Sequence, residues 1–198
     1  MRGLVRVGAA VPSLALGNVK ENMKRHLAMM REAKEKHVSI VTFPELSLTG
    51  YTCGDLFFQR RLLDDVTDAL LALKDEMPEG ILAVVGAPLE IEGALYNCAV
   101  VLHKGEIISA VPKTFLPNNG EFYEKRWFQS GDARRDASVA IPKLKTDVCR
   151  QAIFETEDGV RFGIELCEDL WAPLPPSTML SVEGAEIILN LSASNELL

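Results

Sequence analysis

The feature that most constrains the fold is a series of short apolar runs that alternate with helical stretches. The apolar runs are residues 4–11, 38–43, 80–89 and 186–191. They are rich in β-branched residues and too short for buried helices, so they predict strands. A helical stripe of apolar residues follows Asn18, a residue typical of helix N-caps, and predicts a helix that ends near Lys36. A second helix is expected over residues 60–77.

Two hairpins are expected between these elements. One spans residues 95–111 and turns at Lys104-Gly105, and the other spans 149–167 and turns at residues 157–159. A proline-rich helix start at 172–185 precedes the last strand. Apolar strands, hairpins and helices together predict an α/β fold in which a mixed sheet packs against helices.

The segment from residue 112 to about 145 is predicted to be mostly irregular. A connection of this length in a compact domain is usually functional or disordered. We expect it to be ordered because it carries several aromatic residues, which are Phe115, Phe122, Tyr123, Trp127 and Phe128. The segment is therefore a candidate for part of a functional site.

Composition narrows the class of protein. The 198 residues are enough for one substantial domain, and the net charge of −7 argues against nucleic acid or an anionic membrane as the main partner. The four cysteines are widely spaced, which favours reduced thiols and a cytoplasmic location. We find no uninterrupted apolar run of about 18 residues. The sequence also lacks a clustered Cys/His metal motif and a nucleotide-phosphate loop, so no metal and no cofactor are expected in this chain.

Three polar residues each follow a predicted strand. Glu45 follows residues 38–43, Lys113 follows the first hairpin, and Cys167 follows the second. Catalytic groups of α/β folds gather beyond strand ends, so the three side chains converge if their strands are neighbours.

The stretch "RFGIELCEDLW" surrounds Cys167 with acids, namely Glu165, Glu168 and Asp169. Acidic neighbours disfavour a thiolate, so a cation is expected opposite the sulfur, and Lys113 would supply it. Glu45 would take up and return a proton, and the N–H of Glu168 would help to hold an oxyanion. This set suits attack on an amide or nitrile carbon through a thioester.

Each of these residues also has a structural interpretation. A cysteine at a strand end is often a small buried apolar residue, and this interpretation holds for Cys53, Cys98 and Cys149. A glutamate or lysine beside proline is usually exposed to solvent. The histidines at 26, 37 and 103 show no link to Cys167, which disfavours a Cys–His protease.

Three longer motifs resemble a known family. "FPELSLTGYT" (43–52), "PKTFLPNNGEFYEKRWFQSGD" (112–132) and "GIELCEDLW" (163–171) are similar, in the same order, to the signature regions of the nitrilase, or carbon–nitrogen hydrolase, superfamily. The resemblance implies a nitrilase-type α-β-β-α sandwich. It also implies a triad in which Cys167 is the nucleophile, Glu45 the general base and acid, and Lys113 the group that stabilises the oxyanion.

Within the superfamily, "LTGYTCGDLF", "EFYEKRWF", "CEDLW" and "LNLSASNE" most resemble the glutamine-hydrolysing domains of glutamine-dependent NAD⁺ synthetases. The resemblance implies L-glutamine as substrate and places Tyr51, Glu124, Glu168 and Ser194 at the substrate pocket. It implies that the ammonia passes to a synthetase domain that amidates deamido-NAD⁺ with ATP and Mg²⁺. It also implies a homo-oligomer.

Several expectations and alternatives complete the interpretation. Asn119 stands where the family often has an aromatic residue, and Trp171 is equally a pocket wall or a core residue. Residues 1–198 are expected to form one hydrolase domain that is incomplete at its C-terminus, with an exposed sheet edge and no synthetase domain. The alternatives are a free-standing amidase acting on another small amide, or an inactive assembly module.

Overall fold

The computed structural model describes residues 4–103, 105–133 and 138–194. Its α-helices are α1 (Val19–Glu35), α2 (Arg60–Glu76), α3 (Glu124–Trp127) and α4 (Pro176–Val182). Three 3₁₀ helices are η1 (Tyr51–Phe58), η2 (Gly131–Ala133) and η3 (Cys167–Trp171). The strands are β1 (Val7–Ala9), β2 (Ile40–Thr42), β3 (Leu82–Ile91), β4 (Ala94–His103), β5 (Glu106–Pro112), β6 (Ser138–Ile141), β7 (Thr146–Cys149), β8 (Ile153–Glu155), β9 (Arg161–Leu166) and β10 (Ile187–Leu191).

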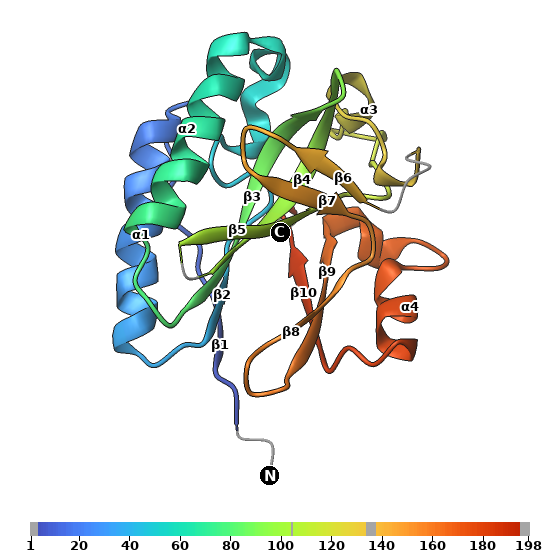
Figure 1. The fold of residues 1–198 in the computed structure, drawn as a ribbon. Coiled ribbons are helices and arrows are strands. Elements are labelled where there is room, and N and C mark those ends of the chain that lie inside the picture. The colour runs from blue at the N-terminus through green and yellow to red at the C-terminus, as the bar shows by residue number, and fades with distance from the viewer. Residues whose placement is uncertain (1–3, 104, 134–137, 195–198) are drawn as a thin grey trace.

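The strands form two sheets that pack face to face. The larger sheet is mixed, in the order β1-β2-β3-β4-β5-β7-β6, and the smaller one has the order β10-β9-β8. Helices α1 and α2 cover the outer face of the larger sheet, and α4 lies outside the smaller sheet (Figure 1). The predicted α-β-β-α sandwich with a mixed sheet is therefore confirmed.

Two apolar cores hold these layers together. One lies between the two long helices and the larger sheet, and the other lies between the two sheets. Strand β3 contributes to both, because successive side chains point to opposite faces of a strand. Ala83 and Val85 face the helices, whereas Val84 packs with Phe162 and Ile164 of β9. This alternation explains why β3 is apolar from Leu82 to Leu89.

The local elements agree with the sequence prediction except where distant strands pair. The described part of segment 112–145 is mostly irregular, as predicted, and its regular elements are the short α3, η2 and β6, the last of which pairs antiparallel with β7. The second hairpin begins at β8 rather than at Cys149, because β7 instead pairs with β5 through Ala110 and Val148. Lys104, in the first predicted turn, lies outside the described residues. Among the described residues, no helix is long and apolar enough to cross a membrane.

Helix α1 carries a buried polar network that holds the loop after β2. The Asn22 side chain donates to the carbonyls of Ala15 (2.9 Å) and Leu48 (3.0 Å). The His26 ring lies between the Asn22 carbonyl (2.7 Å) and the Ser47 hydroxyl (2.9 Å). Since residues 47 and 48 belong to the loop that follows Glu45, α1 fixes the backbone next to that glutamate.

The burial of His26 predicts a loss of stability in acid. Burial lowers the pKa of this imidazole to about 4. As the pH falls below about 6.5 the unfolded chain binds a proton that the folded chain excludes, so stability declines until about pH 4. We expect the free energy of unfolding to fall by about 3 kcal/mol more between pH 7 and pH 4 in the parent protein than in His26→Gln.

Denaturant titrations at a series of pH values would measure this difference. His37→Gln is the matched control, because His37 is exposed. Identical pH dependence in the parent protein and in His26→Gln would contradict the prediction.

Candidate active site

Glu45 reaches the site because its loop crosses the neighbouring strand. Strands β3 and β4 lie between β2, which precedes Glu45, and β5, which precedes Lys113. The loop passes over β3 at Gly86, where an added Cβ would lie 2.3 Å from the Pro44 carbonyl oxygen and 2.4 Å from the Leu46 nitrogen. The approach is therefore possible only without a side chain at position 86.

The three predicted catalytic residues do not come from neighbouring strands. Glu45 and Lys113 follow strands of the larger sheet that are not adjacent, and Cys167 follows β9 of the smaller sheet. The condition on which the predicted convergence depended, that the three strands are neighbours, is therefore not met. The loop crossing brings Glu45 to Lys113, and the packing of the two sheets brings Cys167 toward them, which a strand-by-strand reading cannot show.

A lysine between two carboxylates forms the centre of the site. Lys113 Nζ lies 2.5 Å from Glu45 Oε1 and 2.6 Å from Glu124 Oε1. All three side chains are buried. Tyr51 donates its hydroxyl hydrogen to Glu124 Oε1 (2.7 Å), and Asn97 Nδ2 donates to Glu45 Oε1 (2.7 Å). The predicted site residues Glu45, Lys113, Glu124 and Tyr51 thus lie in one connected cluster.

Burial and charge pairing set the protonation of this cluster. Burial raises the pKa of Glu45, while the Lys113 charge and the Asn97 amide act in the opposite direction. Burial opposes the charge on Lys113, but the two carboxylates outweigh it and raise the pKa of the lysine, which stays cationic. Burial and the Glu124 carboxylate raise the pKa of Tyr51 far above its usual range. The phenol is therefore a hydrogen-bond donor at every physiological pH.

Helix α3 and the 3₁₀ helix η1 are joined on the surface side of this cluster. Asp55 accepts two hydrogen bonds from the Arg126 guanidinium, at 2.7 and 2.8 Å, and one from Trp127 Nε1 at 3.0 Å. These bonds hold the pKa of Asp55 well below its usual range. Because η1 carries Tyr51 and α3 carries Glu124, this contact keeps the donor and the acceptor of their hydrogen bond together.

Cys167 occupies the turn between β9 and η3. Its φ of 44° lies in the left-handed region, which non-glycine residues adopt at a cost and which is common at functional turns. The side chain is 6% exposed, and Sγ lies 3.7 Å from the hydroxyl of Ser194. The sulfur also contributes to the raised pKa of Tyr51, so it lies within electrostatic range of the lysine cluster.

The acids around Cys167 have partners of their own. Asp169 is buried and accepts hydrogen bonds from the backbone N–H groups of Phe115 (2.7 Å), Thr114 (3.0 Å) and Leu166 (3.0 Å). Burial raises the pKa of Asp169 to about 7, against the effect of these amides. Its carboxyl group therefore ties the residues after Lys113 to the residue before Cys167.

The Glu165 side chain lies on the outer face of the smaller sheet, which α4 covers (Figure 1). Its carboxylate accepts from the Ser177 N–H at 3.0 Å and from Asn190 Nδ2 at 3.3 Å. The expectation that Lys113 offsets all the acids near the thiol needs this refinement, because Glu165 and Asp169 are held by other groups. Lys113 itself is shared between Glu45 and Glu124.

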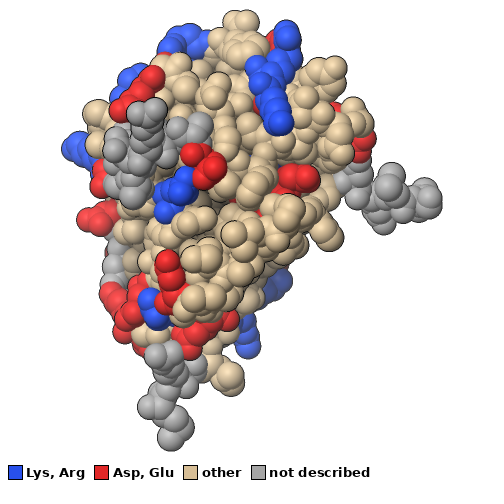
Figure 2. Space-filling model, turned by 90° about the vertical axis from the view of Figure 1, so that its right-hand side faces the viewer, with Lys and Arg blue, Asp and Glu red and all other residues tan. Residues whose placement is uncertain are grey.

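The predicted residue Glu168 lines a pocket of about 410 Å³ beside the site, together with Thr114, Phe115, Lys125 and Trp171. Trp171 is 73% exposed and lines this pocket, so its interpretation as a core residue is wrong. This pocket lies near α3 and η3, on the side where charged side chains are scattered over a mostly uncharged surface (Figure 2).

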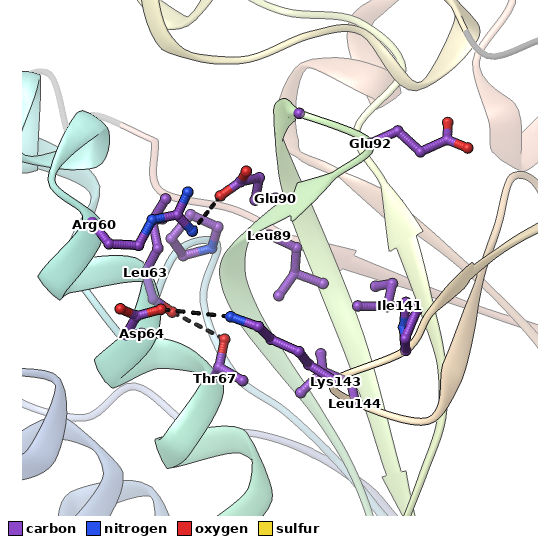
Figure 3. Close-up of a pocket in the computed structure, with 13 residues that line it drawn as sticks. Arg60, Leu63, Asp64, Thr67, Leu89, Glu90, Glu92, Ile141, Lys143 and Leu144 are labelled. Carbon is purple, nitrogen blue, oxygen red and sulfur yellow. Dashed lines mark hydrogen bonds and ion pairs between the residues drawn. The ribbon is translucent and has the colours of Figure 1, made fainter.

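Another pocket, of about 330 Å³, is lined by α2, the β3–β4 turn and residues 141–144 (Figure 3). Ion pairs join Arg60 to Glu90 at 2.6 Å and Lys143 to Asp64 at 3.7 Å across it. Its lining residues include none of the predicted site residues. Four of its charged side chains are thus paired with one another, so they give no reason to place the chemistry there.

Sequence reasoning missed two residues of the site. Asn97 is a fully buried amide inside the apolar strand β4, and a polar residue within the run "LYNCAVV" was the available signal. Phe122 packs edge-on against Tyr51, with ring centroids 6.2 Å apart. Asn119 is exposed, and its backbone carbonyl accepts the Phe122 N–H at 3.1 Å, a bond that does not depend on the side chain at position 119.

The four-layer sandwich and the buried glutamate–lysine–glutamate cluster near a cysteine define a class of hydrolase. The family profile described as carbon–nitrogen hydrolase matches residues 6–197, and the chain belongs to this family. Among individual proteins, it is 37% identical over 195 residues to the glutamine-dependent NAD⁺ synthetase of Mycobacterium bovis. That alignment covers 97% of this chain and 29% of the relative.

Further glutamine-dependent NAD⁺ synthetases are similar to this chain in sequence or in structure. The glutamine-dependent NAD⁺ synthetase of Arabidopsis thaliana is 35% identical over 188 residues, which cover 89% of this chain and 25% of the relative. The crystal structure of such a synthetase from Cytophaga hutchinsonii matches with a TM-score of 0.82 and 29% identity, over 96% of this chain and 30% of that one. An amidase from Nesterenkonia sp. shares the fold, with a TM-score of 0.76 and 17% identity, over 97% and 66% of the two chains. The chain thus spans less than a third of the synthetases that it matches.

A side chain at position 86 should displace the Glu45 loop. We expect Gly86→Ala to lower the free energy of unfolding by about 2–4 kcal/mol, because the new Cβ would overlap backbone atoms that cannot rotate away. Denaturant unfolding measures this change. In the control Gly8→Ala the Cβ would meet only the Val38 side chain, at 3.3 Å, and the loss should be smaller. An equal loss in the two variants would refute the crossing argument.

Proposed function

We propose that this chain is a glutamine amidase domain that hydrolyses L-glutamine to L-glutamate and ammonia. The observation that carries the proposal is the buried Lys113 held between Glu45 and Glu124, close to Cys167 at a turn in the left-handed region. The similarity to glutamine-dependent NAD⁺ synthetases supports glutamine as the substrate. The ammonia would serve a synthetase domain in a larger protein, where ATP and Mg²⁺ drive the amidation of deamido-NAD⁺.

In the first half of the proposed reaction, Cys167 attacks the side-chain amide carbon of glutamine. The Glu45 carboxylate takes the proton of the thiol as the carbon–sulfur bond forms. The resulting tetrahedral oxyanion is stabilised by the Lys113 cation and by the backbone N–H of Glu168. Glu45 then returns the proton to the leaving nitrogen, the carbon–nitrogen bond breaks, and ammonia departs from a thioester.

In the second half, water hydrolyses the thioester. Glu45 accepts a proton from the water as its oxygen attacks the carbonyl carbon, and a second oxyanion forms at the same position. Its collapse breaks the carbon–sulfur bond, and the proton held by Glu45 returns to the sulfur. Glutamate is released with Cys167 and Glu45 restored, so protons and bonds balance over the cycle.

The remaining predicted residues would bind the substrate. Ser194 lies beside the sulfur, and Tyr51 and Glu124 form the adjoining wall through their shared hydrogen bond. Glu168 carries a half-buried carboxylate one residue after the nucleophile, where it would meet the α-ammonium group of glutamine. A charged contact of this kind would favour an amino acid amide over an uncharged amide.

Labelling with a diazo-ketone analogue of glutamine, read by intact mass and peptide mapping, tests the proposal. We expect modification at Cys167 that is prevented by glutamine. Glu45→Gln should slow it by about 100-fold or more, because general-base assistance is lost.

The other cysteines serve as internal controls, since Cys53 and Cys98 are buried and Cys149 is half-buried. Slow or uniform labelling of all four thiols in folded protein would reject the amidase and favour an inactive assembly module. Protection by a different small amide, but not by glutamine, would favour a free-standing amidase.

A further inference from the structure

Asn97 contacts Glu45, Glu124 and Lys113 of the lysine cluster. Its side-chain Nδ2 donates to Glu45 Oε1 at 2.7 Å and lies 3.4 Å from Glu124 Oε2. Its backbone carbonyl accepts the N–H of Lys113 at 2.8 Å. The residue is fully buried within β4, so these contacts are shielded from water. Hydrogen bonds to charged acceptors in such surroundings are stronger than those between neutral groups.

The orientation of the Asn97 amide follows from its neighbours. Two carboxylates face one side of the amide, so the NH₂ group must lie there, because a carbonyl oxygen in that place would repel both. Within the described part of the chain, Asn97 Oδ1 has no hydrogen-bond partner. Burial of an unsatisfied acceptor costs free energy, so packing alone does not account for an asparagine at this position.

The two oxygens of Glu45 have different surroundings. Oε1 receives hydrogen bonds from Lys113 Nζ and Asn97 Nδ2. Among the residues that the structure describes, Oε2 is buried and has no partner. One oxygen is thus fixed by two donors, and the other remains able to accept a proton.

We propose that Asn97 is a positioning residue that holds Glu45 Oε1 and so reserves Glu45 Oε2 for proton transfer. The inference rests on the proposed function in one respect only, namely that the proton taken up by Oε2 comes from the Cys167 thiol. Without the Asn97 amide, Oε1 would be held only by Lys113, which also contacts Glu124. The Glu45 carboxylate would then be free to rotate. The charged groups that contact Glu45 and its partners are Lys113 and Glu124, with the neutral Tyr51 hydroxyl on Glu124.

Direct titration of Glu45 tests the proposal without any need for activity. The protein is labelled with [δ-¹³C]glutamate, and the Glu45 resonance is assigned by its loss in Glu45→Gln. We expect Asn97→Leu, which keeps the approximate shape but removes the donor, to raise the midpoint of Glu45 by about one pH unit. The cause is the loss of a hydrogen bond to the charged form of the carboxyl group.

Asn190→Leu is the matched control, because it removes an amide that donates to another glutamate, Glu165, at 3.3 Å. The control should leave the Glu45 midpoint in place. If Asn97→Leu does not fold, Asn97→Ala also removes the donor, with a smaller side chain. An unchanged Glu45 midpoint in the folded Asn97 variant would overturn the proposal.

A second measurement separates this inference from the proposed function. The acidic limb of the pH profile for the rate of labelling at Cys167 should shift to higher pH in Asn97→Leu. It should stay in place in Asn190→Leu. A parent protein without selective labelling rejects the amidase but leaves the titration of Glu45 as the test of Asn97. Selective labelling in the parent, with an identical profile in both variants, rejects the role of Asn97 alone.

Discussion

The buried ion pairs of Lys113 are the interaction on which the rest of the site depends. A charge removed from water is tolerated only when it is paired and its remaining hydrogen-bonding capacity is used. Lys113 has two carboxylate partners, and Tyr51 and Asn97 donate to those carboxylates in turn. These side chains come from four separate parts of the chain. The loops, the hairpin and α3 must therefore all be in place before the lysine can be buried.

A second set of hydrogen bonds connects this cluster to the nucleophile. The Asp169 carboxylate accepts hydrogen bonds from backbone N–H groups that belong to both sheets. Thr114 and Phe115 follow β5 of the larger sheet, and Leu166 ends β9 of the smaller sheet. Lys113 immediately precedes one of these segments, and Cys167 immediately follows the other. The relative placement of the cation and the thiol is thus set by backbone hydrogen bonds to one rigid carboxyl group, which limits the freedom of both side chains.

Much of this arrangement could be predicted because it depends on short stretches of sequence. The apolar stripe after Asn18 predicts α1, and the Asn18 side chain does accept the N–H of Glu21. The motifs around Glu45, Lys113 and Cys167 indicated the family, which the match over residues 6–197 confirms. The acids next to Cys167 led to the expectation of a cation opposite the sulfur. Some partners of Asp169 and Glu165, however, lie far along the chain, such as Phe115 and Asn190, and no local pattern reveals them.

Local sequence was therefore sufficient for the main helices, most strands, the fold class and the residues proposed for catalysis, because periodicity and motifs act over a few residues. The folded chain alone decided how those residues meet. Glu45 and Lys113 are 68 positions apart, and their contact requires the loop to cross β3 at Gly86. The pairing of β5 with β7 and the burial of Asn97 between two carboxylates likewise depend on distant segments. Such contacts form only when packing excludes water and makes each buried polar group find a partner.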